Sequence, residues 1–340
     1  MKIPQRIKRL KIYGFFHMQY YRIRKKHHIR QTYNKDNYLW GKEYALIAKD
    51  FAEKSVLYHE GAMVESAFIK KESYLLSWFR RELSSVIQQY RNEKETAYPN
   101  VNRIPAKIWV YWWDGLDNAP PIVKGCVRSI KRNCKGYEYQ FIDKENINDY
   151  LTIPSSLLLK HEKGIIGKAH FSDIVRMMLL AKYGGIWMDA TLFCSREIPS
   201  EIMDKAFYSC KKEWTPLDPA HGRWSGWMVG GIPNYRFFRF MRDALEAYWE
   251  NHDEPIEYLM MDYLFSIAYS EFPELKNEVD ELEPQNIARD ELMKKLNEPF
   301  DLTFFNQKTF VFKMSYRYGR PVETTNKKEP TFYYYIVNGK

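Results

Sequence analysis

The sequence predicts an α/β fold, in which helices flank a sheet, preceded by a helical N-terminal region. Between residues 104 and 191, apolar runs of strand length alternate with stretches of helix length, and this alternation is typical of a parallel sheet. Residues 37–94 instead carry apolar side chains at helical spacing, enough for two or three helices. A proline within residues 97–100 marks a linker. We therefore divide the chain into a helical region, 1–100, and an α/β domain, 101–340.

The composition is that of a globular protein long enough to bury a large core. Hydrophobic residues make up 45% of the chain and charged residues 28%. No run of about 18 uncharged apolar residues, the length that spans a membrane, occurs in the sequence. The cysteines lack C-x-x-C spacing, so we expect reduced, buried thiols in a cytoplasmic protein rather than a zinc site. They are Cys126, Cys134, Cys194 and Cys210.

The net charge of +9 is concentrated at the N-terminus. Residues 1–30 contain ten Lys and Arg residues, no Asp or Glu, and interspersed Ile, Tyr and Phe. Such a segment suits the surface of an anionic membrane, at about 1 kcal/mol per well-placed cation. The alternative is a solvated basic face on a terminal helix. We do not expect nucleic-acid binding, because no recognisable nucleic-acid module accompanies the charge.

The α/β domain begins with a predicted strand over residues 104–113, where aromatic residues follow a proline and precede an Asp-Gly turn. The strand ends at Trp112 and Trp113, which suit either a protein core or a flat ligand. The next predicted elements are a helix over residues 120–131 and a strand over residues 137–142, which ends at Asp143.

The most informative stretch is residues 169–191. Ser172 suits a helix N-cap and Asp173 a first helical turn, and apolar residues follow at helical spacing, so we expect a helix that Gly184-Gly185 ends. A short apolar run then suits a buried strand. It delivers Asp189 at its C-terminal end, where open α/β sheets bind ligands.

Asp173, Arg176 and Asp189 are predicted to lie together. Asp173 and Arg176 are three apart on the helix and share a face, and the glycine turn folds the next strand back beside them. Two carboxylates and one guanidinium suit a divalent ion, sugar hydroxyls and a diphosphate. The alternative is a helix-cap carboxylate, a structural Arg–Asp pair and a solvated strand end.

The stretch HFSDIVRMMLLAKYGGIWMDAT, residues 170–191, resembles the signature of the bacterial capsular polysaccharide synthesis glycosyltransferases. It is similar, more distantly, to the DXD sugar transferases, which include the yeast initiating mannosyltransferase and the large clostridial glucosylating toxins. This resemblance implies the GT-A fold, a Rossmann-like mixed sheet flanked by helices. It also implies that three residues of the stretch contact the donor, namely Asp173, Arg176 and Gly185.

The same resemblance implies a metal site. Asp189 matches the first carboxylate of the D-x-D motif, which holds Mn²⁺ or Mg²⁺ on the nucleotide diphosphate. Thr191 stands where the second carboxylate would be, and a hydroxyl is a weaker ligand for a hard cation.

Two other segments resemble the family. The first strand is similar to its I-P-K-x-I-W-x-x-W strand, so Trp112 or Trp113 would stack on uracil and Asp143 would approach the base. The segment at 312–317 is similar to its closing H-K-L-x-x-K element, which implies cations near the donor phosphates. These are Lys313 and Arg317, while Phe312 replaces the usual His.

After Thr191 the spacing of the sequence motifs becomes less regular. Residues 211–231 are rich in Pro, Gly and Trp, and we expect an acceptor-binding loop there. An apolar helix over 258–265 contains Asp262, which is either hydrogen-bonded structurally or directed at the acceptor, because an unsatisfied buried carboxylate is costly. Further predictions are a helix over 237–249, a charged and solvated helix over 274–296, and an edge strand over 331–337.

Together these features predict a retaining glycosyltransferase of capsular polysaccharide biosynthesis. It would move a hexose from a nucleotide-sugar, uridine diphosphate-linked, to a lipid-linked acceptor at the inner face of the cell membrane, with Asp189 and Asp262 as catalytic residues. One alternative is a non-catalytic scaffold that binds nucleotide-sugar, which Thr191 and Phe312 favour. A sugar-nucleotide pyrophosphorylase is disfavoured, because the sequence has no glycine-rich N-terminal phosphate loop.

Overall fold

The chain forms two compact units. The computed structural model describes residues 25–93, 103–306, 308–319 and 321–339. The boundary between the units lies at residue 80. Helix α4 (Ser84–Arg91) belongs to the second unit, because it buries Ile87 and Tyr90, and Tyr90 packs edge-on against Phe240 of that unit. The first unit is the part up to Phe79 with Ile256–Tyr258, and the second is Arg80–Pro255 with Leu259–Lys340.

The first unit is helical, as the apolar spacing predicts. Glycines at positive φ separate its helices, Gly41 at 89° and Gly61 at 103°, a conformation that L side chains rarely adopt. The Tyr44 hydroxyl donates to the carbonyl of Ile256 at 2.7 Å. Most cations of the predicted basic segment lie outside the described residues, which begin at residue 25. The N-terminal helices are residues 25–39, α2 (Lys42–Tyr58), α3 (Ala62–Glu82) and α4 (Ser84–Arg91).

The second unit is built on a sheet that has five strands in the described part of the chain, in the order β2-β1-β3-β6-β5. Strand β1 runs parallel to β2 and β3, whereas β6 runs antiparallel to β3 and β5. The predicted α/β fold with a mixed sheet is therefore confirmed. The strands are β1 (Lys107–Tyr111), β2 (Glu138–Ile142), β3 (Gly185–Met188), β5 (Phe207–Ser209) and β6 (Met228–Gly231).

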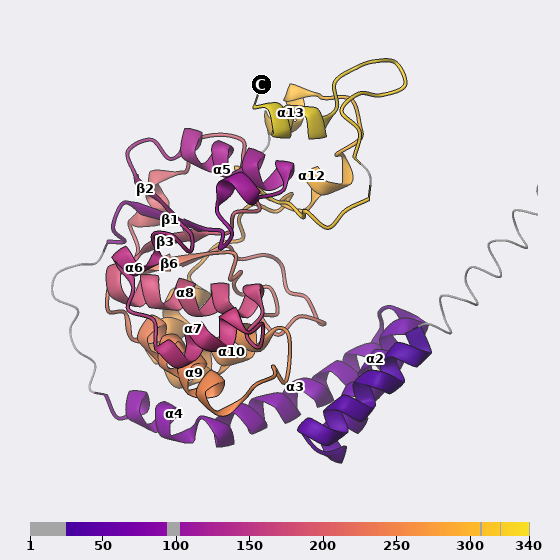
Figure 1. Cartoon of the computed structure of the whole chain (residues 1–340), viewed down its shortest axis with the longest axis vertical. Coiled ribbons are helices and arrows are strands. Elements are labelled where there is room, and N and C mark those ends of the chain that lie inside the picture. The colour runs from indigo at the N-terminus through magenta and orange to yellow at the C-terminus, as the bar shows by residue number, and fades with distance from the viewer. Residues whose placement is uncertain (1–24, 94–102, 307, 320, 340) are drawn as a thin grey trace, which may run out of the picture. The chain divides into compact units, whose positions relative to one another are not determined.

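Helices flank both faces of this sheet. Figure 1 shows α5 on one side and α8 and α9 on the other. Helix α8 begins at Lys168 after Gly167, so Ser172 lies inside it and the predicted N-cap is wrong. The helices are α5 (Pro121–Asn133), α6 (Ile147–Tyr150), α7 (Ser155–Glu162), α8 (Lys168–Tyr183), α9 (Arg236–Asn251), α10 (Met260–Glu271), α11 (Pro273–Asp280) and α12 (Glu291–Lys294), with 3₁₀ turns at Leu116–Asn118, Ser200–Met203 and Leu302–Asn306.

A second, two-stranded sheet joins distant parts of the chain. Strand β4 (Leu192–Cys194) pairs antiparallel with β7 (Val311–Lys313), and Leu192 lies opposite Lys313. This pairing brings residue 313 next to the strand end that carries Asp189 and Thr191.

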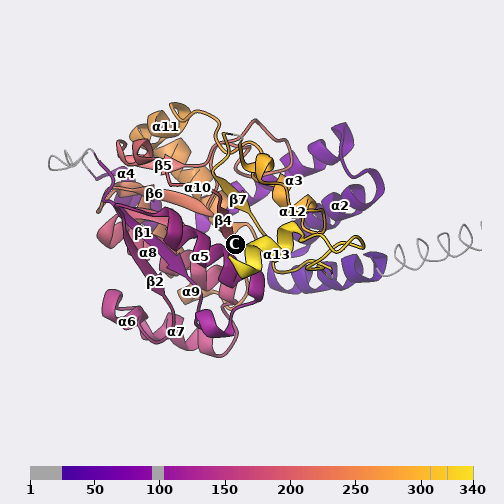
Figure 2. The same cartoon turned by 90° about the horizontal axis from the view of Figure 1, so that it is seen from above.

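The C-terminal run is a helix, so the predicted edge strand over 331–337 is wrong. Thr331 caps α13 (Phe332–Asn338) by accepting a hydrogen bond from the Tyr334 amide at 3.2 Å. Helix α13 lies against α5 in both views (Figures 1 and 2). The contact is close because Gly125 has no side chain. A Cβ there would approach the Ile336 carbonyl oxygen to 2.3 Å.

Two further predictions need correction. The expected loop over 211–231 ends in β6, which pairs tightly with β3. A Cβ on Gly230 would lie 2.3 Å from the Gly185 carbonyl oxygen. The expected helix over 274–296 is interrupted, and it buries several apolar side chains, among them Leu275 and Leu292. None of the helices in the described ranges is long and apolar enough to cross a membrane.

Candidate functional site

Three predicted site residues follow the carboxyl ends of neighbouring parallel strands. Trp112 follows β1, Asp143 follows β2 and Asp189 follows β3. Because these strands are parallel, their carboxyl ends share one edge of the sheet. Strand β6 begins at the same edge, since Met228 pairs with Met188. This edge is the candidate site.

Asp189 lies at the centre of the site, with a cation on each side. Its Oδ1 accepts hydrogen bonds from Trp187 Nε1 at 2.9 Å and Arg176 Nη2 at 3.2 Å, and its Oδ2 accepts from Lys313 Nζ at 2.6 Å. Burial alone would raise the pKa of this carboxyl. Lys313 and Arg176 outweigh burial and hold the pKa below its ordinary value, so Asp189 is ionised.

Asp173 and Arg176 lie beside it, as the helical spacing predicts. Arg176 Nη1 donates to Asp173 Oδ1 at 3.0 Å, and the guanidinium lies 4.9 Å from the ring centre of Trp187. Arg176 is only 5% exposed. Burial is the main cause that raises the pKa of Asp173 to about 6, with a further contribution from Asp189 and opposed by Arg176.

Two buried polar atoms near this cluster have no hydrogen-bond partner among the described residues. They are Nε of Arg176 and the hydroxyl of Tyr111. The Tyr111 ring lies 5.9 Å from that of Trp187, which also contacts the Arg176 guanidinium. Buried polar groups are nearly always satisfied by protein, water or ligand, so these two atoms are exceptions beside the ion-paired cluster.

Thr191 also faces Lys313. Its hydroxyl accepts a hydrogen bond from Lys313 Nζ at 2.9 Å. A divalent ion at the predicted positions would need several oxygen ligands. Both oxygens of Asp189 are instead bonded to cationic or N–H donors, and no group of three or more His, Cys, Asp or Glu side chains among the described residues could hold a metal. This donor set does not fit a divalent ion, and the expected Mn²⁺ or Mg²⁺ stays a prediction.

Asp262 lies near Arg176 and follows a residue that contacts it. Its Oδ1 accepts a hydrogen bond from Trp224 Nε1 at 3.0 Å, and the preceding Met261 receives one at its sulfur from Arg176 Nη1, also at 3.0 Å. Burial raises the pKa of Asp262 to about 7, and the Trp224 hydrogen bond only partly opposes it. Gly226 lets the loop before β6 approach, because a Cβ there would meet Met261 at 2.1 Å.

The two tryptophans after β1 differ in their surroundings. Trp113 packs edge-on against His161 and Phe171. Trp112 meets Tyr316 edge-on at 5.4 Å, and Tyr316 itself is 41% exposed. Arg317 is exposed beside Tyr316. The structure thus brings Trp112 and the 313–317 segment together, while Trp113 fills the space between α7 and α8.

Two predicted donor residues have local structural roles. Asp143 Oδ1 accepts from the Glu145 amide at 2.9 Å, and its carboxylate borders the turn at Gly115. Gly185 begins β3, about 13 Å of strand before Asp189. Its φ is 93°, and a Cβ would lie 2.7 Å from the Lys107 carbonyl oxygen. Gly185 therefore lets β3 pass close to β1, and it does not lie with the other candidate donor residues.

Sequence reasoning missed several side chains that complete this edge of the sheet. Trp187 looked like part of an apolar strand, and nothing in the sequence pairs Met261 or Trp224 with the central motif. Only Tyr316 has a signal in the sequence, because it is an aromatic residue that closely follows Lys313. The sulfur of Met261, the indoles of Trp187 and Trp224, and the ring of Tyr316 all lie against predicted site residues.

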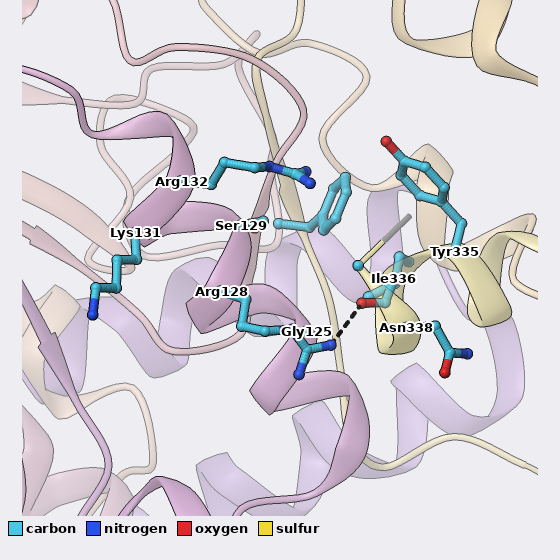
Figure 3. A pocket seen from close by; sticks show the side chains of 10 residues that line it. Gly125, Arg128, Ser129, Lys131, Arg132, Tyr335, Ile336 and Asn338 are labelled. Atoms are coloured by element: carbon cyan, nitrogen blue, oxygen red, sulfur yellow. Dashed lines mark hydrogen bonds between the residues drawn. The ribbon is translucent and has the colours of Figure 1, made fainter.

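A cavity of about 410 Å³ lies elsewhere, between α5 and α13. Figure 3 shows Arg128 reaching the end of α13, where Nη2 donates to the carbonyl of Ile336 at 3.5 Å and to that of Val337. None of the predicted site residues lines this cavity.

Comparisons with known proteins match a family profile to most of the chain. A profile of the family described as "Capsular polysaccharide synthesis protein" matches residues 59–336. The "O-glycosyltransferase braB" of Annulohypoxylon truncatum is 28% identical over 107 residues, 29% of this chain and 25% of that protein. The chain thus matches about a quarter of the length of this curated relative. The solved structure "PaToxG Glycosyltransferase" has a TM-score of 0.39 at 17% identity, covering 62% of this chain and 82% of its own.

Proposed function

Because the chain belongs to the capsular polysaccharide synthesis protein family, we propose that it is a glycosyltransferase that moves a hexose from a uridine diphosphate sugar to a lipid-linked polysaccharide intermediate. The observation that carries this proposal is the ion-paired cluster at the carboxyl edge of the sheet. It consists of Asp173, Arg176, Asp189 and Lys313.

The cluster offers separate groups to the two halves of the donor. Lys313 and the exposed Arg317 offset the charge that grows on the departing diphosphate, which is a main source of rate enhancement in group transfer. Asp173 and Arg176 hydrogen-bond the hexose hydroxyls. The Arg176 Nε and the Tyr111 hydroxyl, which have no partner in the described part of the chain, support this role. Trp112 stacks on the uracil, with Asp143 nearby at the end of β2.

In the transfer step, an acceptor hydroxyl oxygen forms a bond to the anomeric carbon of the hexose while the bond from that carbon to the diphosphate oxygen breaks. The hydroxyl proton passes to the leaving diphosphate. Attack from the face that the diphosphate leaves retains the anomeric configuration, and no covalent enzyme intermediate is needed. Asp262, whose pKa is raised to about 7 by burial, positions the acceptor hydroxyl by accepting a hydrogen bond from it, and it accepts this bond more strongly when it is ionised.

The basic N-terminal segment suits the place where a lipid-linked acceptor lies. We expect residues 1–30 to dock the protein on the anionic inner face of the cell membrane. Flotation with anionic liposomes should be lost when the cations of this segment are replaced by Gln. Unchanged flotation would contradict the docking.

The test of the activity is nucleoside diphosphate release from a panel of uridine and guanosine diphosphate sugars. The native protein should release UDP, and Asp189→Asn should reduce release by about 10²–10³-fold. Asp253→Asn, at a side chain that is 71% exposed, is the matched control and should behave as the native protein. UDP that binds without turnover would favour the scaffold alternative. A panel in which no nucleotide binds would contradict the proposal.

A further inference from the structure

Lys313 occupies the position that a DXD-type metal would need. Its ammonium lies 2.6 Å from Asp189 Oδ2 and 2.9 Å from Thr191 Oγ1, the two atoms predicted to hold the ion. The backbone fixes this placement, because β4 and β7 pair in register and the Met314 amide donates to the Thr191 carbonyl at 2.9 Å. The lysine is therefore part of the sheet framework beside the motif and not a surface side chain that reaches it by chance.

We infer that Lys313, held by Asp189 and Thr191, takes the place of the divalent ion and binds the donor diphosphate, so that donor binding needs no metal. The inference rests on the proposed function, because it concerns the same donor. It assigns Asp189 and Thr191 as positioning residues that orient an ammonium.

Hydrogen-bond capacity supports this assignment. A lysine ammonium has three N–H donors. Two of them are used by Asp189 and Thr191, and the structure gives this ammonium no third acceptor among the described residues. The Lys313 side chain is 29% exposed, so the remaining donor is accessible from the solvent side. A diphosphate oxygen is an acceptor well suited to it, since charge-assisted bonds of this kind are short and strong.

The net charge of the ion-paired cluster also supports the assignment of Lys313. Asp173 and Asp189 contribute two negative charges, and Arg176 and Lys313 contribute two positive charges, so these four ion-paired groups sum to zero. Without a bound diphosphate, a divalent ion added here would leave an excess of two positive charges in a partly buried site. Thr191 is consistent with this balance, because a second carboxylate in its place would make the group net negative and favourable for a dication.

Binding of UDP and GDP tests the inference without knowledge of the sugar. Affinity is measured by calorimetry in EDTA and again in Mn²⁺, and uptake of Mn²⁺ with and without UDP is followed by electron paramagnetic resonance. We expect the native protein to bind at least one of the two nucleotides equally well in EDTA and in Mn²⁺, and to take up no Mn²⁺ beyond what UDP itself binds.

Variants of Lys313 separate its role from a structural one. Lys313→Ala should weaken nucleotide binding in EDTA by about 10–100-fold, the effect of one charge-assisted contact, whereas Lys313→Arg should keep metal-independent binding. The double variant Lys313→Ala/Thr191→Asp should recover affinity in Mn²⁺ only and should take up the ion. Lys294→Ala, at a lysine that is 66% exposed, is the control and should bind as the native protein.

Three results would overturn the inference. The first is native binding that Mn²⁺ strengthens tenfold or more, which contradicts metal independence but leaves the proposed glycosyltransferase intact. The second is unchanged binding by the Lys313→Ala variant in EDTA. If that variant does not fold, the third is loss of binding in the folded Lys313→Arg protein together with its recovery in Mn²⁺. Failure of every nucleotide to bind is a different result, since it contradicts the proposed function itself.

Discussion

Asp189 and Asp262 both lie near Arg176, and the surroundings of these two carboxylates differ. Asp189, on the β3 side, lies between Arg176 and Lys313, and these cations hold its pKa below the ordinary value against the effect of burial. Asp262, on the α10 side, accepts one hydrogen bond from an indole, and burial raises its pKa to about 7. One side of the site therefore keeps a permanent charge, while the other changes charge near neutral pH.

This difference separates the two sides chemically. A fixed carboxylate that orients cations suits the donor side, where a diphosphate of constant charge is bound. A carboxylate that titrates near pH 7 suits the acceptor side, where a hydroxyl must be held and loses its proton. The following changes test whether the two sides behave independently.

The largest effect is expected for Asp189→Asn. The substitution leaves Arg176 and Lys313 beside a neutral amide, which should lower the free energy of unfolding at pH 7 by about 3 kcal/mol, since breaking a buried ion pair is costly. Because the native pKa is lowered, this stabilisation is present above pH 3.8 and is lost as the pH falls below it. Urea unfolding at pH 7 and pH 3 measures both the loss of stability at neutral pH and its disappearance in acid. Equal stability of variant and native protein at pH 7 would mean that the cations do not depend on Asp189.

Asp262→Asn is expected to raise the free energy of unfolding, whereas Asp189→Asn lowers it. The native pKa is about 7 and the unfolded value is 3.8, so between these pH values the folded protein binds the extra proton and its stability falls as the pH rises. Above pH 7 the Asp262 carboxylate is ionised, and the burial of its charge then lowers the free energy of unfolding by the full amount. The amide removes that cost while its oxygen still accepts from Trp224, so the variant should be about 2 kcal/mol more stable at pH 8 and unchanged at pH 4. A variant less stable at pH 8 would contradict the raised pKa. UDP affinity should not change.

Local geometry explains which parts of the site the sequence predicts. Asp173, Arg176 and Asp189 lie within one helix–turn–strand unit, so helical spacing and the strand end bring them together without knowledge of the rest of the fold. Lys313 is 124 residues from its partner Asp189, and only the β4–β7 pairing brings the two into contact. The family resemblance led to a lysine near the phosphates, but not to its bonds with Asp189 and Thr191.

Tertiary packing decides two positions that local sequence patterns do not describe. Gly185 is next to the motif in sequence, yet it lies at the opposite end of β3, where β1 requires a residue without a side chain. The Tyr-rich C-terminal run has the composition of a strand, but Thr331 caps a helix there and Gly125 of α5 makes room for it. Patterns among neighbouring residues in the sequence cannot show that Gly185 packs against β1 or that α13 packs against Gly125.

Trp112→Ala tests whether this ring binds the base on the donor side. If this ring stacks on uracil, its loss should weaken UDP binding about tenfold, since stacking of a base on an aromatic side chain contributes about 1–3 kcal/mol. Binding of a nucleotide-free sugar phosphate should not change. Trp214→Ala removes a tryptophan that is 67% exposed in another loop and serves as the control. Equal UDP affinity in the Trp112 variant and the native protein would exclude this ring from the base site.

The smallest effect is expected for Trp224→Phe on the acceptor side. The indole N–H stabilises the ionised form of Asp262, and its ring stacks on Phe265 at 4.1 Å. Phenylalanine keeps a ring for this stacking and removes the hydrogen bond, which is worth about 1 kcal/mol to the carboxylate. The pKa of Asp262 should therefore rise further, and the midpoint of the pH profile for hexose transfer should move upward from about 7 with little change in the rate at high pH. Release of UDP to water, which does not use the acceptor, should keep its pH profile. A profile for transfer that stays in place would mean that Asp262 does not set the charge of the acceptor side.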